Sequence, residues 1–170
     1  MKTVSNSGPV MSLAKLGSLE LLYNLYGQIY IPSAVYYEVV SHGLDSGYPD
    51  AYYIRSSILK DHIAVINVSD SEMPDNISNL PLDIGEKQSL YLTIRDEFDL
   101  ILLDDLKARE EAKALGLNVK GTLGVIVQAY REGYINLDKV EETIQTIIAR
   151  DDIWISNELC LKVLDELKKS

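Results

Sequence analysis

Four consecutive aliphatic residues, Leu100–Leu103, run directly into two aspartates in this chain. A segment so short and so apolar is typical of a strand inside a parallel sheet whose two faces are both covered by helices. In sheets of this kind, ligands bind beyond the carboxyl ends of the strands, where loops cross to the following helices. The segment therefore predicts an α/β fold and places Asp104 and Asp105 where a ligand would bind.

The remaining sequence alternates similar apolar segments with amphipathic ones. Further strands are predicted over residues 2–5, 28–31, 63–68 and 117–120, the third of them buried. Helices are predicted over residues 9–16, 18–25, 32–43, 48–59, from 83 onward, 107–115, 122–131, 137–148 and 156–167, with an exposed loop over 69–81. This alternation predicts a parallel sheet between helical layers. Because no linker or repeat divides the chain, we expect one domain over 1–170, with the C-terminal helices of 137–170 packed on it or extending it.

Charge and cysteine content narrow the classes of ligand. The chain has 16 Lys and Arg against 26 Asp and Glu, a net charge of −10, which argues against broad adhesion to nucleic acid. It leaves room for a metal-dependent enzyme that acts on phosphate, because bound cations reverse the local field of clustered carboxylates. With one cysteine and two histidines, a divalent ion in this protein would have oxygen ligands.

The sequence contains no segment that indicates a membrane protein. No apolar run approaches the roughly 20 residues that span a bilayer, and the N-terminus lacks the apolar core of a signal peptide. We therefore expect a cytoplasmic protein with no membrane partner.

Polar and acidic residues gather where predicted strands end or helices begin. They are Asn6 and Ser7 after the first strand, Glu38 and Glu86 in helices that follow loops, and Asp104 and Asp105. Carboxylates a few ångströms apart raise each other's pKa, so a cluster of them usually implies a bound cation. Mg²⁺ suits such a cluster, since it takes one or two protein carboxylates and keeps water and phosphate oxygens as its other ligands.

Each acid also has a simpler structural interpretation. Asp83 stands three positions before Glu86, which is nearly the capping-box pattern of a helix start. Asp104 and Asp105 suit a helix cap and a first-turn acid. Glu38 suits a solvated helix edge. These interpretations and the cation site remain alternatives at the level of the residues alone.

Tyrosines gather in the N-terminal third of the chain, and the helix around Tyr52 and Tyr53 is the segment most suited to meet a partner. Tyrosine is enriched at protein interfaces because its ring is apolar and its hydroxyl is polar. Core packing accounts for some of these tyrosines equally well.

The order of these motifs resembles the PIN-domain nucleases, and more narrowly a prokaryotic subgroup related to the VapC-type toxins. The resemblance covers nearly the whole chain. It is carried by a strand into Asn6-Ser7, by "YIPSAVYYEVV" with Glu38, by "LDIGEKQSLYLT" with Glu86, by "LILLDDLKAREEAKALGLNVKGTLGVI" with Asp105, and by the ending "ISNELCLKVLDELKK".

The resemblance implies a three-layer α/β/α sandwich with a central parallel sheet and a Mg²⁺- or Mn²⁺-dependent endoribonuclease. Its acids fall on the catalytic residues Glu38, Glu86 and Asp105, whereas Asn6 stands where the family usually has Asp. The implied metal ligands are Asn6, Glu38, Glu86, Asp104 and Asp105, and the residues expected near the RNA substrate are Ser7, Lys15, Lys87 and Arg109.

Three functions follow as hypotheses. The first is the ribonuclease toxin of a type II toxin–antitoxin pair, which implies a small antitoxin partner and a homodimer. The second is a degenerate, non-catalytic module that binds a protein or RNA, favoured by the neutral Asn6. The third, a phosphoacceptor receiver domain, fits poorly because it needs an acidic pair where this first strand ends in Asn6-Ser7.

Overall fold

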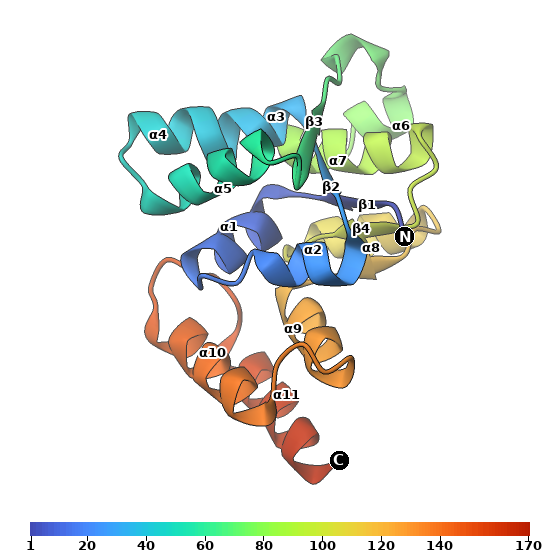
Figure 1. Cartoon of the computed structure of the whole chain (residues 1–170). Coiled ribbons are helices and arrows are strands. Elements are labelled where there is room, and N and C mark those ends of the chain that lie inside the picture. The colour runs from blue at the N-terminus through green and yellow to red at the C-terminus, as the bar shows by residue number, and fades with distance from the viewer.

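Five short apolar segments pair as parallel strands, as the alternation in the sequence predicts. The computed structural model describes residues 1–170 and contains one sheet of strand order β3-β2-β1-β4-β5 (Figure 1). The strands are β1 (Thr3–Ser5), β2 (Ile29–Pro32), β3 (Ile63–Ile66), β4 (Leu100–Leu102) and β5 (Val119–Lys120). All four strand pairings are parallel, which confirms the predicted α/β sandwich.

Helices connect the strands and cover both faces of the sheet. In chain order they are α1 (Ser7–Lys15), α2 (Glu20–Tyr26), α3 (Ser33–Tyr36), the π-helix η1 (Tyr37–His42), α4 (Gly43–Asp45), α5 (Pro49–Leu59), the 3₁₀ turn η2 (Asp70–Glu72), α6 (Asp75–Ser78), α7 (Ile84–Arg95), α8 (Leu106–Ala114), α9 (Thr122–Arg131), α10 (Leu137–Ala149) and α11 (Asn157–Lys169). None of these helices has the length and apolarity needed to span a bilayer.

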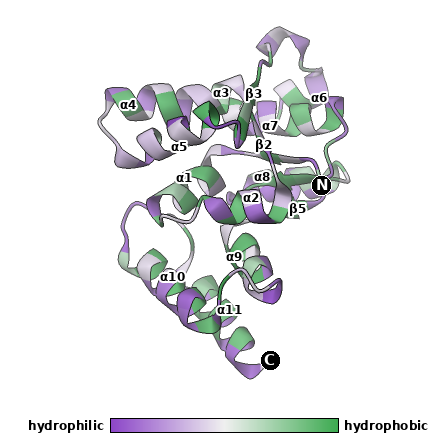
Figure 2. Cartoon of the chain, in the orientation of Figure 1, coloured by the Kyte–Doolittle hydropathy of each residue, from purple (hydrophilic) through white to green (hydrophobic).

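Strand β4 is buried on both faces, as its unbroken aliphatic run predicts. Leu100 and Leu102 belong to the main apolar cluster with residues of α1, α2 and α9. Ile101 and Leu103 point the other way and pack with residues of α7 and α8. This division follows from the two-residue period of a strand. Figure 2 shows apolar residues on the inward sides of the surrounding helices.

The two C-terminal helices share the main core. Val140 and Ile144 of α10 and Cys160 of α11 belong to the same apolar cluster as Val10 and Leu13 of α1. α10 packs against both α9 and α11. In Figure 1 these helices extend from the side of the sheet that α1, α2 and α9 cover, away from α7.

Three expectations about local structure are wrong. The helix from Ser33 does not end at Gly43 but continues to Asp45 through the π-helix η1. Gly43 adopts helical angles, φ −62° and ψ −42°, and a Cβ atom there would lie 2.7 Å from the Cβ of Ala51. This glycine therefore permits close packing of α5 instead of terminating a helix.

The other two differences concern β3 and the segment after it. β3 is not buried on both faces, since it is an edge strand and the side chain of Val65 is 39% exposed. Residues 69–81 are not a plain loop, because η2 and α6 lie within them. A capping box forms at η2, where the Ser69 backbone N–H donates to Glu72 at 2.7 Å.

Strand order locates the binding edge of the sheet. The chain moves outward from β1 to β3 and then returns to place β4 on the other side of β1, so the order reverses between β1 and β4. Ser5 pairs with Leu102 at the end of these strands, and the Asn6 N–H donates to the Leu102 carbonyl at 3.0 Å. Ligands of open α/β sheets bind at such a reversal point.

Candidate functional site

A cavity of about 1130 Å³ opens at the carboxyl ends of β1 and β4. Its walls come from α1, η1, α8, β5, α11, the starts of α5, α7 and α9, and the connection between α10 and α11. Of the residues predicted for the site, those that line the cavity are Asn6, Ser7, Lys15, Glu38, Glu86, Asp104, Asp105 and Arg109. The fold therefore brings together residues that are far apart in the sequence.

Lys87 is the predicted site residue that does not line this cavity. Its ammonium group donates a hydrogen bond of 2.8 Å to the carbonyl of Ser78, which holds α7 against α6. A role of Lys87 in substrate binding remains a prediction without a supporting contact.

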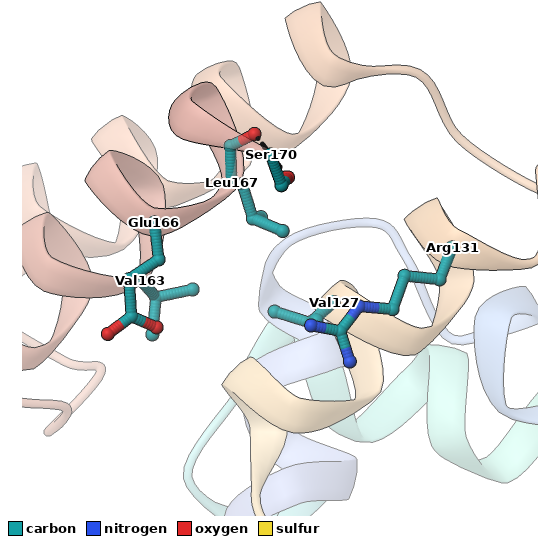
Figure 3. Close-up of a pocket in the computed structure, with 6 residues that line it drawn as sticks. All are labelled: Val127, Arg131, Val163, Glu166, Leu167 and Ser170. Atoms are coloured by element: carbon teal, nitrogen blue, oxygen red, sulfur yellow. Dashed lines mark hydrogen bonds between the residues drawn. The ribbon is translucent and has the colours of Figure 1, made fainter.

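Figure 3 shows a second, much smaller crevice between α9 and α11. Its volume is about 100 Å³, and its lining residues are Val127, Arg131, Val163, Glu166, Leu167 and Ser170. Glu166 is the one acidic side chain in its lining and Arg131 lies there with it, so this crevice does not compete as a site built of acidic side chains.

Asn6 contributes a buried oxygen that has no hydrogen-bond partner. It occupies the N-cap position of α1, yet its side chain does not cap the helix, and its Oδ1 atom is buried and unpaired. Leaving a polar group in this state costs about 1–3 kcal/mol. Gly85 keeps the approach open, since a Cβ at that position would lie 3.4 Å from Asn6 Oδ1. Asn6 Oδ1 is thus a neutral, buried oxygen atom that accepts no hydrogen bond from the protein.

Glu38 reaches the cavity from the π-helix η1. The Ser7 hydroxyl donates a hydrogen bond of 2.5 Å to Glu38 Oε2, and this contact links the start of α1 to η1. π-helical turns are rare and frequently occur at functional sites. Glu38 Oε1 receives no hydrogen bond from the protein, so one oxygen of this exposed carboxylate can take another ligand.

Glu86 is held at the start of α7 by the predicted capping box. Its backbone N–H donates to Asp83 Oδ1 at 2.8 Å, and its Oε2 atom accepts from the Asp83 backbone N–H at 3.0 Å. The pKa of the Glu86 carboxyl is raised to about 6, chiefly by burial and also by the charges of Asp83, Asp105 and Glu38, while the hydrogen bond from the Asp83 N–H lowers it. The three predicted catalytic acids therefore interact electrostatically.

Asp104 and Asp105 have different roles at the end of β4. Asp105 is the N-cap of α8, where its Oδ1 accepts from the Ala108 N–H at 2.9 Å. Asp104 accepts from the Thr122 N–H at 2.7 Å and from the Thr122 hydroxyl at 2.6 Å, so both of its oxygens are engaged. Burial raises the pKa of Asp104, opposed by these hydrogen bonds and by the charge of Arg109.

Gly121 permits the close packing that carries Asp104 and Arg109. A Cβ atom on Gly121 would lie 2.6 Å from Arg109 Nη1 and 2.9 Å from Asp104 Oδ1. We expect Gly121→Ala to lower the free energy of unfolding by about 1–3 kcal/mol, because an added methyl group must displace engaged polar groups. Denaturant unfolding of the metal-free protein measures this effect.

Gly124→Ala is the matched control for that substitution. A Cβ there would meet only Lys120 Cγ, at 2.6 Å, and Cδ, at 3.2 Å, as the nearest atoms of a flexible side chain. Gly124 lies inside α9, where alanine favours the helix by up to about 1 kcal/mol. Equal losses of stability in the two variants would contradict the role given to Gly121.

The oxygen donors of the site suit a hard divalent cation, although the carboxylates do not form a closed cage. As the side chains stand, no group of three or more His, Cys, Asp or Glu residues is arranged to hold a metal ion. Glu38, Glu86 and Asp105 each use one carboxylate oxygen in a structural hydrogen bond and retain the other. Such an open set, with the unpaired Asn6 oxygen beside it, fits an ion that keeps several waters, as Mg²⁺ does.

Sequence reasoning missed several residues of the cavity wall. Asp50, in the first turn of α5, is buried and lines the cavity, as do Lys113, Lys120 and the exposed Trp154. An acid in the first turn of a helix, such as Asp50, is common and does not indicate a ligand site. Lys113 and Lys120 belong to no motif that indicates one. Trp154 was the one detectable signal, because it is the only tryptophan and lies in a polar stretch between two amphipathic helices.

Comparison with known protein families gives one match. A family model described as a PIN domain matches residues 2–169 of the chain. No curated protein matches it at a significant level.

Proposed function

This chain belongs to the PIN-domain family, and we propose that it is a Mg²⁺- or Mn²⁺-dependent endoribonuclease. PIN domains are usually metal-dependent nucleases, and the parallel sheet and the acids at its edge agree with that class. The observation that carries the proposal is that Glu38, Glu86 and Asp105 line one cavity at the point where the strand order reverses.

Glu38, Glu86 and Asp105 would hold one or two divalent ions through the carboxylate oxygens that the protein leaves without partners. A bound ion would supply activation of water and stabilisation of charge for the hydrolysis of an RNA phosphodiester to 3′-hydroxyl and 5′-phosphate ends. Asn6 Oδ1 would add a neutral ligand. This assignment would give a partner to Asn6 Oδ1, the buried side-chain oxygen of the site that has no hydrogen bond.

Other residues of the cavity would position these acids and the substrate. Ser7 orients Glu38 through its 2.5 Å hydrogen bond. Asp104, with both oxygens bonded to Thr122, joins β4 to α9 and acts as a positioning residue in this proposal, instead of a direct ligand. Arg109 donates to the Leu103 carbonyl at 3.0 Å and keeps further N–H donors for a phosphate.

A titration with Mg²⁺ and Mn²⁺, followed by calorimetry, tests the proposal without knowledge of the RNA. We expect saturable binding to the wild type and a loss of at least about tenfold in affinity for Asp105→Asn, because ligand charge sets the affinity of such sites. Asparagine still accepts the Ala108 N–H, so helix α8 keeps its cap.

Asp138→Asn serves as the control, because Asp138 lies in the first turn of α10 and is exposed outside the cavity. It should bind the ions as the wild type does. Absence of binding at millimolar metal, or unchanged binding by Asp105→Asn, would overturn the proposed metal centre.

The finer biological role that we propose is the toxin of a type II toxin–antitoxin pair, acting in the cytoplasm as a homodimer with a small antitoxin. The support is the exposure of three tyrosines in the packed elements η1 and α5, where Tyr37, Tyr52 and Tyr53 are 64%, 57% and 62% exposed. A short reading frame next to the gene, whose product co-purifies with this chain, would support that role. An isolated gene would oppose it.

The neutral residue Asn6 also supports a second candidate function, a non-catalytic binding module. Asn6 removes one negative charge from the site, which favours a non-catalytic module that binds RNA or a protein partner. That module would bind RNA with no cleavage in Mn²⁺, whereas the ribonuclease would yield products with 5′-phosphate ends.

A further inference from the structure

Trp154 is an exposed residue in the wall of the cavity that the proposed catalytic acids also line. It lies in the connection between α10 and α11, its side chain is 92% exposed, and it lines the same cavity as Glu38, Glu86 and Asp105. The residue before it, Ile153, is buried in the main core. Burial of an indole contributes a large favourable free energy, which the exposed Trp154 does not gain within the chain. A ligand that covers the ring would provide it.

Hydrogen bonds fix the segment that carries this indole. The Arg150 guanidinium contacts both carboxylate oxygens of Asp152, each at 2.7 Å. Lys15 of α1 donates to the Asp152 carbonyl at 2.8 Å, which ties the segment to the cavity wall. The Trp154 indole N–H donates to the Asp151 carbonyl at 3.1 Å, so its single donor is satisfied. The ring faces are therefore the part of Trp154 that remains available for a ligand.

Cations on another wall of the cavity suit a phosphate backbone. Arg109 and Lys113 of α8, and Lys120 of β5, line the cavity, and none of them takes part in a salt bridge. This is notable in a chain of net charge −10, where acidic partners outnumber basic groups. Two of them are hydrogen-bonded within the protein, Lys120 to Gln128 Oε1 and Arg109 to the Leu103 carbonyl. The cavity thus combines cations that form no salt bridge, a group of acids and an exposed aromatic residue.

We propose that Trp154 is a stacking platform for an unpaired base of the bound RNA. The proposal rests on the ribonuclease function proposed above. Proteins that bind single strands combine a basic wall along the backbone with aromatic rings on which bases stack. A base inside a duplex has both faces covered by its neighbours, so it cannot stack on a protein side chain.

The intrinsic fluorescence of the wild-type protein tests this inference directly, because Trp154 is the only tryptophan. The probes are a uridine octamer, an abasic octamer of the same backbone charge, and a blunt RNA duplex. EDTA is present so that no cleavage occurs. We expect saturable quenching by the uridine octamer and little change with the other two probes, since they offer no free base.

Affinity for the labelled octamer is measured in parallel by fluorescence anisotropy. Stacking of one base accounts for roughly 5- to 150-fold in affinity, so Trp154→Ala should weaken binding by about tenfold or more, and Trp154→Phe should recover part of that loss. The matched control is Leu161→Ala, because Leu161 of α11 is an apolar residue that is 58% exposed and does not line the cavity. It should bind as the wild type does.

The possible failures are distinguishable. Octamer binding without quenching, or equal affinity in Trp154→Ala, overturns the platform and leaves the metal centre intact. Absence of octamer binding also overturns it, and the metal titration then decides the ribonuclease proposal separately. A lower oligomeric mass of Trp154→Ala with unchanged RNA affinity would instead assign the indole to a protein interface.

Discussion

Glu86→Gln is expected to stabilise the metal-free protein while it removes most of the response to divalent ions. Burial is the main cause that raises the pKa of Glu86 to about 6, above the value of 4.5 for a free glutamate. The folded state therefore binds more protons than the unfolded state between these values. The contribution of protonated Glu86 to folding stability is complete below pH 4.5 and is lost as the pH rises through 6.

At pH 8 the ionised Glu86 side chain thus lowers stability by about 1–2 kcal/mol, and a neutral glutamine avoids this loss. The amide oxygen of glutamine still accepts the Asp83 N–H, so the capping box survives. Thermal unfolding in EDTA should show a higher midpoint for Glu86→Gln at pH 8 and a smaller gain at pH 5. Metal-dependent cleavage should fall at least about a hundredfold, because several kcal/mol of charge stabilisation depend on the ion.

The control for this substitution is Glu72→Gln, since Glu72 accepts from the Ser69 N–H in a second capping box. Glu72 lies outside the cavity and pairs with Arg95 at 3.3 Å. Its neutralisation should bring no gain of stability and no change in metal binding. A Glu86→Gln variant that is less stable than the wild type at pH 8, with its metal response intact, would exclude Glu86 from the metal centre.

Asn6→Asp should have the opposite pair of effects. Asn6 is buried, and a carboxylate there would join the charges of Glu86, Asp105 and Glu38 without a cation to balance them. We expect the metal-free variant to lose about 1–3 kcal/mol of stability at pH 8. With Mg²⁺ present, the added charge should raise the affinity about tenfold or more and increase cleavage, because ligand charge tunes such sites.

Thermal unfolding with and without Mg²⁺ measures both effects in one variant. The control is Asn136→Asp, which makes the same chemical change at the N-cap of α10, where the side chain accepts from the Lys139 N–H and is exposed. An N-cap tolerates either residue, so this control should change little. If Asn6→Asp gains nothing from Mg²⁺, position 6 does not contact the ion.

Much of the fold follows from local patterns in the sequence. The aliphatic run at β4, the capping box at Asp83 and Glu86, and the bounds of α9 are all confirmed. Each of these signals is contained within a few neighbouring residues. They identify secondary structure because periodicity and caps act over short distances.

The remaining features depend on contacts between distant segments. Gly43 is a residue type that commonly ends helices, but here it allows α5 to pack closely, because a Cβ atom on it would collide with Ala51. Glu38 and Glu86 could be placed in helices from the sequence, whereas their mutual repulsion is visible only in the folded chain. Trp154 and Asp50 reach the cavity through the packing of α5, α10 and α11, which no local pattern encodes.

The position of β1 in the middle of the sheet affects how the protein is made on the ribosome. Strands β1, β2 and β3 can pair as soon as they emerge, but one side of β1 stays open until residues 100–105 have been synthesised. A chain that stops earlier carries Asn6, Glu38 and Glu86 but lacks Asp105 and the cavity wall beyond it. A translation product that stops before residue 105 would therefore lack one of the three acids of the proposed nuclease centre.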